Sequence, residues 1–123
     1  MIPCGNSSGT TQVNSLFQGL GADQSSVSTI WLNIETNPEA ICYWQSNQAA
    51  NCQIVTDLVA AIKANGKQAG IYSNIYMWNS IIGSTCQNLD PSIPIWYPHD
   101  DKLPNTYDFM PFGVWTSTST MLK

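Results

Sequence analysis

Hydrophobic residues recur with a helical period in two long stretches of the chain, and this pattern predicts helices there. In residues 11–20 the apolar side chains fall on one helical face, as Val13, Leu16, Phe17 and Leu20. In residues 50–65 the same kind of stripe consists of Ile54, Val55, Leu58, Val59 and Ile62. Gly66 follows the second stretch, where a helix end favours a left-handed residue. A third, shorter helix is predicted at residues 75–82, before Gly83.

Alternating side chains predict a strand at residues 29–35, which lie between the first two helices. One face of this segment is aliphatic, with Ile30, Leu32 and Ile34. The other face is aromatic and polar, with Trp31, Asn33 and Glu35. Such a split is typical of a strand that packs its aliphatic side on helices and turns its second side toward the interior of an α/β barrel.

Three further strands are predicted at residues 69–74, 93–98 and 112–115. The third strand should have frayed ends, because Pro94 and Pro98 each remove a hydrogen-bond donor from the ladder. The fourth consists of the four residues FGVW. Strands that alternate with helices indicate a parallel sheet.

These elements predict the α/β class, as an incomplete TIM-like (β/α) barrel of parallel strands with outer helices, in one partial domain at residues 1–123. A complete eight-stranded barrel needs roughly 250 residues, and the chain has 123. Missing strands would leave exposed sheet edges, which favour self-association. Light scattering from a stable monomer would contradict this expectation.

Composition favours a protein that works outside the cytosol. Only 10% of the residues are charged, whereas 42 of the 123 residues are Ser, Thr, Asn or Gln. Such surfaces suit a secreted or a lysosomal or phagosomal protein. The first residues, MIPCGNSSGT, have no signal-peptide pattern, so we expect that a leader has been removed or that the natural start lies elsewhere.

The charge balance argues against two classes of partner. The chain has four Lys, no Arg and a net charge of −4, so it offers no basic surface for the phosphates of nucleic acid or for an anionic membrane. No apolar stretch approaches the roughly 18 residues that span a bilayer. We therefore expect no nucleic-acid partner and no membrane partner.

Four cysteines, Cys4, Cys42, Cys52 and Cys86, predict two disulfides in an oxidising compartment. The chain has no CxxC motif and a single histidine, so no metal site and no cofactor are expected. Three pairings of the cysteines are possible. We favour Cys42 with Cys52, which would close a short loop before a helix, and this leaves Cys4 for Cys86.

Candidate chemistry gathers where the predicted strands end. Glu35 ends the first strand, with Asn33 on the same face. The ends of the next strands supply Tyr72, Tyr97, His99 and Asp101. The carboxyl ends of parallel strands are where α/β barrels place their active sites. Together with Trp31 and four further tryptophans, these residues suit a sugar ligand, because indole rings stack on sugar C–H faces and glycosidic cleavage requires a carboxylic acid.

Four motifs in this order resemble the lysozymes of glycoside hydrolase family 25, in the branch found in amoebae and nematodes. They are WLNIE, GIYSN followed by MW, IWYPHDD and FGVW. The corresponding family strings are approximately WLDIE, GIYTS followed by QW, LWYAHYD and FGGW. The leading IPC also resembles a PC motif of that branch. The resemblance covers about three quarters of the chain, and the four ordered motifs together are fairly specific.

The resemblance implies a modified β/α barrel that hydrolyses the bond between N-acetylmuramic acid and N-acetylglucosamine in bacterial peptidoglycan. Glu35 matches the general acid of the family, and Asn33 replaces an aspartate that assists it. Tyr97, His99 and Asp101 match positions that line the cleft. An aspartate on the family's opening strand has no counterpart in this chain.

Three functions are consistent with these observations. The first, which we favour, is an N-acetylmuramidase, a glycosidase of antibacterial character in peptidoglycan catabolism, with activity reduced or lost because of Asn33 and the missing first strand. The second is a non-catalytic relative that binds peptidoglycan. The third is a fragment that a partner segment or a second copy completes. Lysis of cell walls separates the first from the others, and retention on insoluble glycan separates the second from the third.

Overall fold

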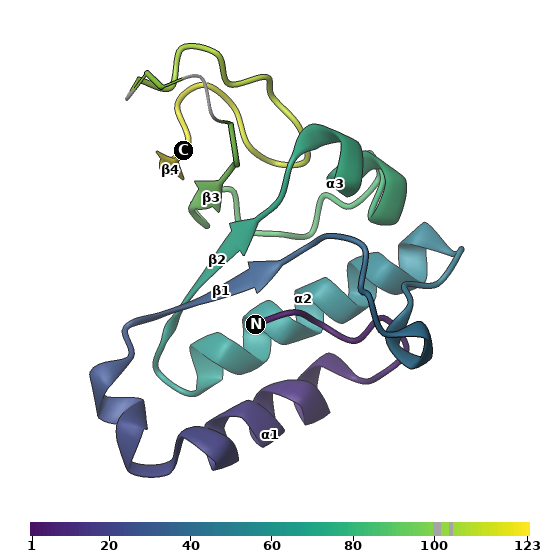
Figure 1. Ribbon diagram of the computed structural model, residues 1–123, viewed down its shortest axis with the longest axis vertical. Coiled ribbons are helices and arrows are strands. Elements are labelled where there is room, and N and C mark those ends of the chain that lie inside the picture. The colour runs from purple at the N-terminus through teal and green to yellow at the C-terminus, as the bar shows by residue number, and fades with distance from the viewer. Residues whose placement is uncertain (100–101, 104) are drawn as a thin grey trace.

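The structure, a computed structural model, describes residues 1–99, 102–103 and 105–123. Helices and a sheet form two adjacent layers (Figure 1). In chain order the elements are α1 (Gly9–Leu20), the 3₁₀ helix η1 (Gly21–Ser26), β1 (Thr29–Asn33), the 3₁₀ helix η2 (Ala40–Cys42), α2 (Gln48–Ala64), β2 (Gln68–Tyr72), α3 (Ile75–Ile81), β3 (Ile95–Trp96) and β4 (Met121–Leu122).

The sheet is parallel throughout, with four strands in the order β1-β2-β3-β4. Asn33 pairs with Tyr72, Tyr72 with Trp96, and Trp96 with Leu122. All carboxyl ends therefore lie at one edge of the sheet. The predicted parallel α/β arrangement is confirmed, and the three predicted helices lie within two residues of the observed bounds.

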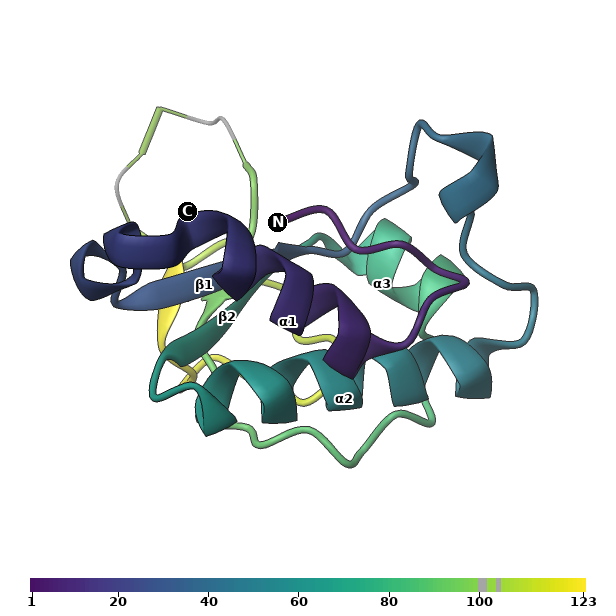
Figure 2. The same ribbon diagram turned by 90° about the horizontal axis from the view of Figure 1, so that it is seen from below.

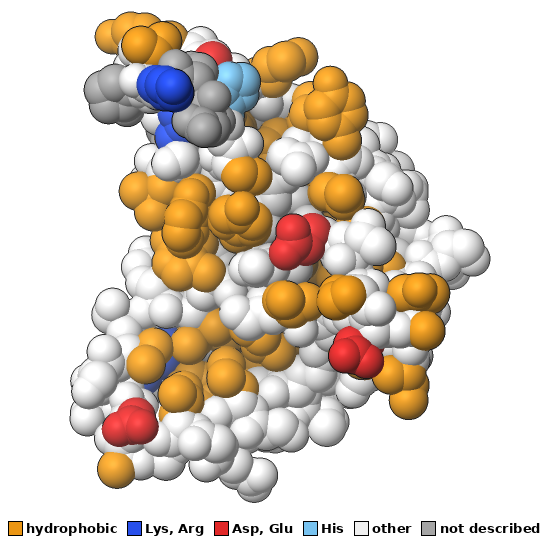
Figure 3. Space-filling model, viewed as in Figure 1, with side chains coloured by type: hydrophobic (Ala, Val, Ile, Leu, Met, Phe, Trp, Pro, Cys, Tyr) orange, Lys and Arg blue, Asp and Glu red, His pale blue; other side chains and the backbone are white. Residues whose placement is uncertain are grey.

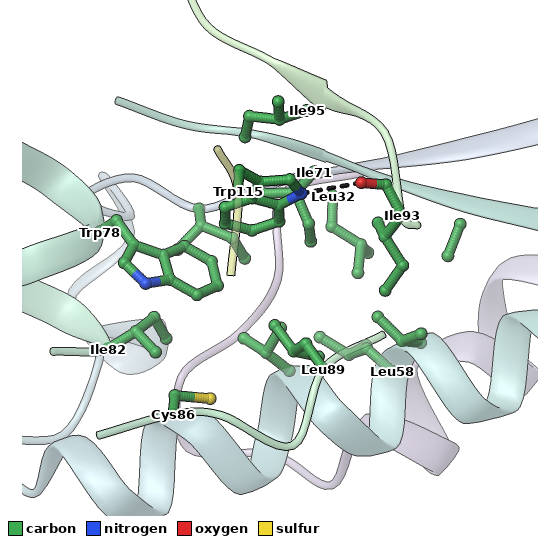
Figure 4. Packing of buried hydrophobic residues seen from close by; sticks show 14 of the residues in the cluster. Leu32, Leu58, Ile71, Trp78, Ile82, Cys86, Leu89, Ile93, Ile95 and Trp115 are labelled. Atoms are coloured by element: carbon green, nitrogen blue, oxygen red, sulfur yellow. Dashed lines mark hydrogen bonds between the residues drawn. The ribbon is translucent and has the colours of Figure 1, made fainter. Parts of the chain in front are cut away.

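The helices α1 and α2 lie together on one face of the sheet (Figure 2). Leu32 and Ile71 project from neighbouring strands toward the helix layer and Leu58 of α2, and Ile95 of the next strand lies above Trp115 (Figure 4). These four side chains are fully buried. Burying side chains of this size stabilises a fold by about 1.5–3 kcal/mol each, so this core fixes the sheet on α2.

The opposite face of β1 is the aromatic and polar one, as predicted. The exposure of β1 alternates, with Ile30 and Leu32 buried and Trp31 and Asn33 only partly so. No described helix or strand packs over Trp31 and Trp96, whose side chains stay in part solvent-accessible. We call this the open face of the sheet.

Helix ends follow the predicted backbone chemistry. Gly66 and Gly83 have φ values of 76° and 81° and lie just beyond α2 and α3. The side chain of Asn47 accepts a hydrogen bond from the Ala50 amide and caps α2. Both ends of the longest helix are thus satisfied by neighbouring residues.

Residues 112–115 form a turn, so the fourth predicted strand is wrong. The Trp115 amide donates to the Phe112 carbonyl at 3.0 Å, and Gly113 between them has φ 57°. The turn buries both aromatic rings, which explains why the four residues resemble a buried strand. Trp115 packs perpendicular to Trp78, with ring centroids 4.8 Å apart. The fourth strand is instead β4, residues 121–122.

The favoured disulfide pairing is also wrong. The bonds join Cys4 to Cys42 and Cys52 to Cys86. Cys42 lies in η2, where the Gly5 amide donates to its carbonyl at 3.0 Å, so the N-terminal segment lies beside it. Cys52 lies on α2 and faces the segment after α3. Cys42 and Cys52 are close in sequence but do not pair, because Cys42 lies in η2 before α2 and Cys52 lies within α2, where each has a different neighbour.

The free edge of β1 carries backbone contacts from Met1. The Met1 ammonium donates to the Trp31 carbonyl at 2.9 Å, and the Asn33 amide donates to the Met1 carbonyl at 2.9 Å. Burial lowers the pKa of this ammonium. Self-association through the sheet edges stays a prediction.

We predict that the double substitution Cys52→Ser with Cys86→Ser lowers the free energy of unfolding by about 3–4 kcal/mol, because the bond closes a long loop in the unfolded chain. The two cysteines are 34 positions apart. Urea unfolding measures the loss, and mass spectrometry of unreduced peptides checks the pairing. A peptide that links Cys42 to Cys52 would contradict the structure.

Candidate functional site

Glu35 lies just beyond β1, at the carboxyl edge of the sheet. The ladder continues for one residue past the strand, since the Ile34 amide donates to the Tyr72 carbonyl at 2.9 Å. Glu35 is partly buried, and the side-chain amide of Asn33 donates to its Oε1 at 3.4 Å. The neighbour on the same face is therefore a neutral donor that orients one carboxylate oxygen.

Aromatic rings continue the open face from Glu35 across the sheet. Trp96 packs edge-on against Trp31 and Tyr72, with ring centroids 5.6 Å and 5.1 Å apart. Gly70 allows Trp31 to lie over β2, because a Cβ there would come within 2.6 Å of the indole. Figure 3 shows hydrophobic side chains gathered on this side of the molecule, with isolated acidic ones between them. The open face therefore presents aromatic side chains beside the carboxylate of Glu35.

A pocket of about 410 Å³ lies at the same edge, beyond β2 and β3. Residues from the start of α3, from the segment after β3 and from the segment before the 112–115 turn line it. They are Asn74, Ile75, Tyr76, Tyr97, Pro98, His99, Asp108, Phe109, Met110 and Phe112. Aromatic walls with a few polar groups are typical of small-molecule sites.

Asp108 contacts three other polar side chains at this pocket. Its Oδ1 accepts from the Tyr97 hydroxyl at 2.9 Å and lies 3.2 Å from Nζ of Lys123. Its Oδ2 lies 3.2 Å from Nε2 of His99, an ion pair when the imidazole is protonated. Burial raises the pKa of Asp108, but donation from Tyr97 and Lys123 outweighs it and leaves the pKa below its usual value.

The structure divides the predicted site residues into two groups. Trp31, Asn33, Glu35 and Tyr72 lie on or just beyond the open face, whereas Tyr97 and His99 line the pocket, and Glu35 does not line it. Asp101 lies outside the described residues.

Sequence reasoning missed Asp108, and it named Trp44 only as one of five tryptophans suited to a sugar ligand, without its contact to Glu35. Trp44 donates its indole N–H to the main-chain carbonyl of Glu35. Asp108 is an isolated carboxylate in sequence, and its partners Tyr97, His99 and Lys123 come from distant positions. No local motif marks either contact.

The described residues also bear on a membrane span and on a metal site. Within residues 1–99, 102–103 and 105–123, no helix is long and apolar enough to cross a bilayer. Across the same part of the chain, no three His, Cys, Asp or Glu side chains gather as they would around a metal ion.

The parallel strands and their helices define an α/β protein, and the carboxyl edge of the sheet, where α/β folds place their ligand sites, carries a carboxylate, amides and aromatic rings. The family model described as lysozyme-like protein 1 matches residues 1–121, and the chain belongs to that family. The resemblance in the four motifs is confirmed.

Curated relatives come from a nematode and an amoeba. The chain is 32% identical over 119 residues to lysozyme-like protein 5 of Caenorhabditis elegans, covering 94% of this chain and 53% of that protein. It is 34% identical over 116 residues to probable GH family 25 lysozyme 2 of Dictyostelium discoideum, covering 94% and 50%. Counting factor 45-1 of the same amoeba is 29% identical over 116 residues, covering 92% and 36%.

The chain thus spans about half the length of the first two of these relatives. No solved structure matches it significantly.

We predict that Asp108→Asn lowers the free energy of unfolding at pH 7 and that its difference from wild type shrinks in acid. A carboxyl whose pKa is lowered in the folded state stabilises the fold above its unfolded pKa, about 3.9. That contribution disappears as the pH falls through the lower folded value. Urea unfolding at about pH 7 and pH 2.5 measures both differences, with Asp23→Asn in η1 as the control. A difference that is equal at both pH values would contradict the assignment.

Proposed function

We propose that the chain is part of a lysozyme-like glycoside hydrolase, an N-acetylmuramidase that acts on bacterial peptidoglycan. The single observation that carries the proposal is Glu35 at the carboxyl end of a parallel strand, beside an aromatic open face. Family membership supports the reaction class. The names of two relatives, which include the word lysozyme, support it further.

The proposed chemistry rests on Glu35 as the general acid. A protonated Glu35 donates to the glycosidic oxygen as the bond from that oxygen to the anomeric carbon breaks. Water then supplies a hydroxyl to that carbon and a proton to the carboxylate. The rings of Trp31, Tyr72 and Trp96 offer faces and edges to the C–H groups of sugars. Asn33 orients the carboxylate but cannot offset positive charge that develops on the sugar.

The wider proposals follow the same argument. We propose that the four strands belong to a (β/α) barrel, since their order in the sheet equals their order in the chain and the helices α1 and α2 cover one face. Tyr97, His99 and Asp101 are proposed to bind substrate, and for Tyr97 and His99 the pocket supports this. The two disulfides fit an extracellular or lysosomal setting, where an antibacterial role would apply.

A second function, glycan binding without cleavage, is favoured by one observation. Position 33, where the resemblance implies an aspartate, holds Asn33, whose amide donates to the Glu35 carboxylate, so this position provides no second acid. One similar protein, counting factor 45-1, is not named a lysozyme, so similarity to this chain does not by itself imply lysis.

We predict that Glu35→Gln abolishes lysis, with a loss of at least about 100-fold, because a neutral amide cannot protonate the leaving oxygen. Clearing of Gram-positive cell-wall suspensions measures the rate. Glu39→Gln is the matched control, since Glu39 is the second glutamate of the chain and is exposed. Lysis by Glu35→Gln at the wild-type rate would remove Glu35 from the mechanism.

We predict that Asn33→Asp raises the lytic rate about tenfold, which corresponds to 1.4 kcal/mol of barrier. The new carboxylate would stabilise developing positive charge and, by like-charge repulsion, favour the protonated form of Glu35. Asn14→Asp adds the same charge on the exposed side of α1 and is the control.

A different result would favour glycan binding. If wild type and Asn33→Asp both show no lysis while insoluble peptidoglycan retains the protein, glycan binding replaces hydrolysis as the proposed function. If the protein is neither lytic nor retained, the fragment interpretation applies.

A further inference from the structure

We propose that Trp44 is a positioning residue for Glu35, and that Gly5 and the Cys4–Cys42 bond hold Trp44 in place. The inference rests on the proposed function, because it gives Glu35 the role of the acid. It gives a specific role to Trp44, which the sequence places only among the five tryptophans suited to a sugar ligand, and to the loop of residues 36–47 that follows β1.

Beyond β1, side chains and not the sheet donate hydrogen bonds to the carbonyls of Ile34 and Glu35. The Ile34 carbonyl accepts from the buried hydroxyl of Ser73 at 2.8 Å. The Glu35 carbonyl accepts from Nε1 of Trp44 at 2.9 Å. Side chains from two different loops therefore fix the two carbonyls around Glu35. Fixing the carbonyl of Glu35 also fixes the direction in which its Cα–Cβ bond leaves the chain.

Trp44 is held by the N-terminal segment, which lies against its backbone. A Cβ on Gly5 would come within 2.4 Å of Cα of Trp44, so only glycine allows the N-terminal segment to lie this close. The Gly5 amide donates to the Cys42 carbonyl at 3.0 Å, and the Gln45 side chain donates to the Gly5 carbonyl at 3.1 Å. The bond from Cys4 to Cys42 closes the same contact covalently.

The two ends of the loop of residues 36–47 are anchored by separate hydrogen bonds. Near its start, the buried side chain of Asn37 donates to the Pro3 carbonyl at 2.8 Å. Near its end, fully buried Asn51 accepts from the Gln45 amide at 3.0 Å and donates to the Gln45 carbonyl at 2.7 Å. With both ends fixed, the indole of Trp44 has a defined position relative to the end of β1. A loop held in this way acts as a rigid support for the carboxylate.

The test compares Trp44→Phe with Trp115→Phe. Both substitutions remove one indole donor to a carbonyl, since Trp115 donates to Ile93 at 2.8 Å, but only Trp44 contacts Glu35. We expect Trp44→Phe to lower kcat for cell-wall lysis by about tenfold with little change in KM, because misplacing a reacting group weakens the chemical step more than binding. Trp115→Phe should change stability without this loss of kcat.

A second readout does not need activity. Glu35 and Glu39 are the only glutamates, so in a Glu39→Gln background a ¹³C label on glutamate carboxyl carbons reports Glu35 alone. Trp44→Phe should shift or broaden this signal. Cys4→Ser with Cys42→Ser, which keeps the indole but removes the covalent link between the loop and the N-terminal segment, should do the same, and Trp115→Phe should leave the signal in place.

The two readouts distinguish failure of this inference from failure of the proposed function. If the wild type shows no lysis but the Glu35 signal moves in Trp44→Phe, the proposed enzymatic activity is overturned and the positioning role is supported. An active wild type whose kcat and carboxyl signal are the same in Trp44→Phe overturns the positioning role. Equal effects of Trp44→Phe and Trp115→Phe on kcat and on the signal also overturn it, because the effect would then be one of general stability.

Discussion

The parallel pairing of β1 with β2 above α2 is the interaction on which the rest of the structure depends. Leu32 and Ile71 lie side by side in register and are both fully buried toward the helix layer. Because side chains alternate along a strand, burying Leu32 turns Trp31 and Asn33 to the open face. A shift of one residue in the pairing would bury the polar set and expose the aliphatic one, so the core and the site are fixed by the same register.

Features that depend on local periodicity could be predicted from the sequence. The stripe through Leu58 and Ile62 gives α2, and the alternation through Leu32 gives β1 together with the side on which Glu35 lies. Pro94 and Pro98 correctly limit the third strand, which has only two residues. In each case the residues that decide the structure are neighbours in the chain.

Features that depend on distant contacts could not be predicted. Trp115 and Phe112 satisfy the pattern of a buried strand. However, Gly113 between them has a left-handed backbone conformation in a turn, and both aromatic rings pack against Trp78. The disulfide partners follow from where η2 and α2 lie in space, which the spacing of cysteines does not contain. Asp108 likewise gains its importance from residues up to 15 positions away.

The two perpendicular tryptophan pairs have a spectroscopic consequence. Trp78 and Trp115 are buried, with 0% and 1% of their surface exposed, whereas Trp96 in the other pair is 37% exposed. A dissolved quencher such as iodide therefore reaches one pair and not the other, and the intrinsic fluorescence separates into a protected and an accessible component. A molecule that covers the open face would shield the accessible component, which makes the protein its own optical reporter of occupancy.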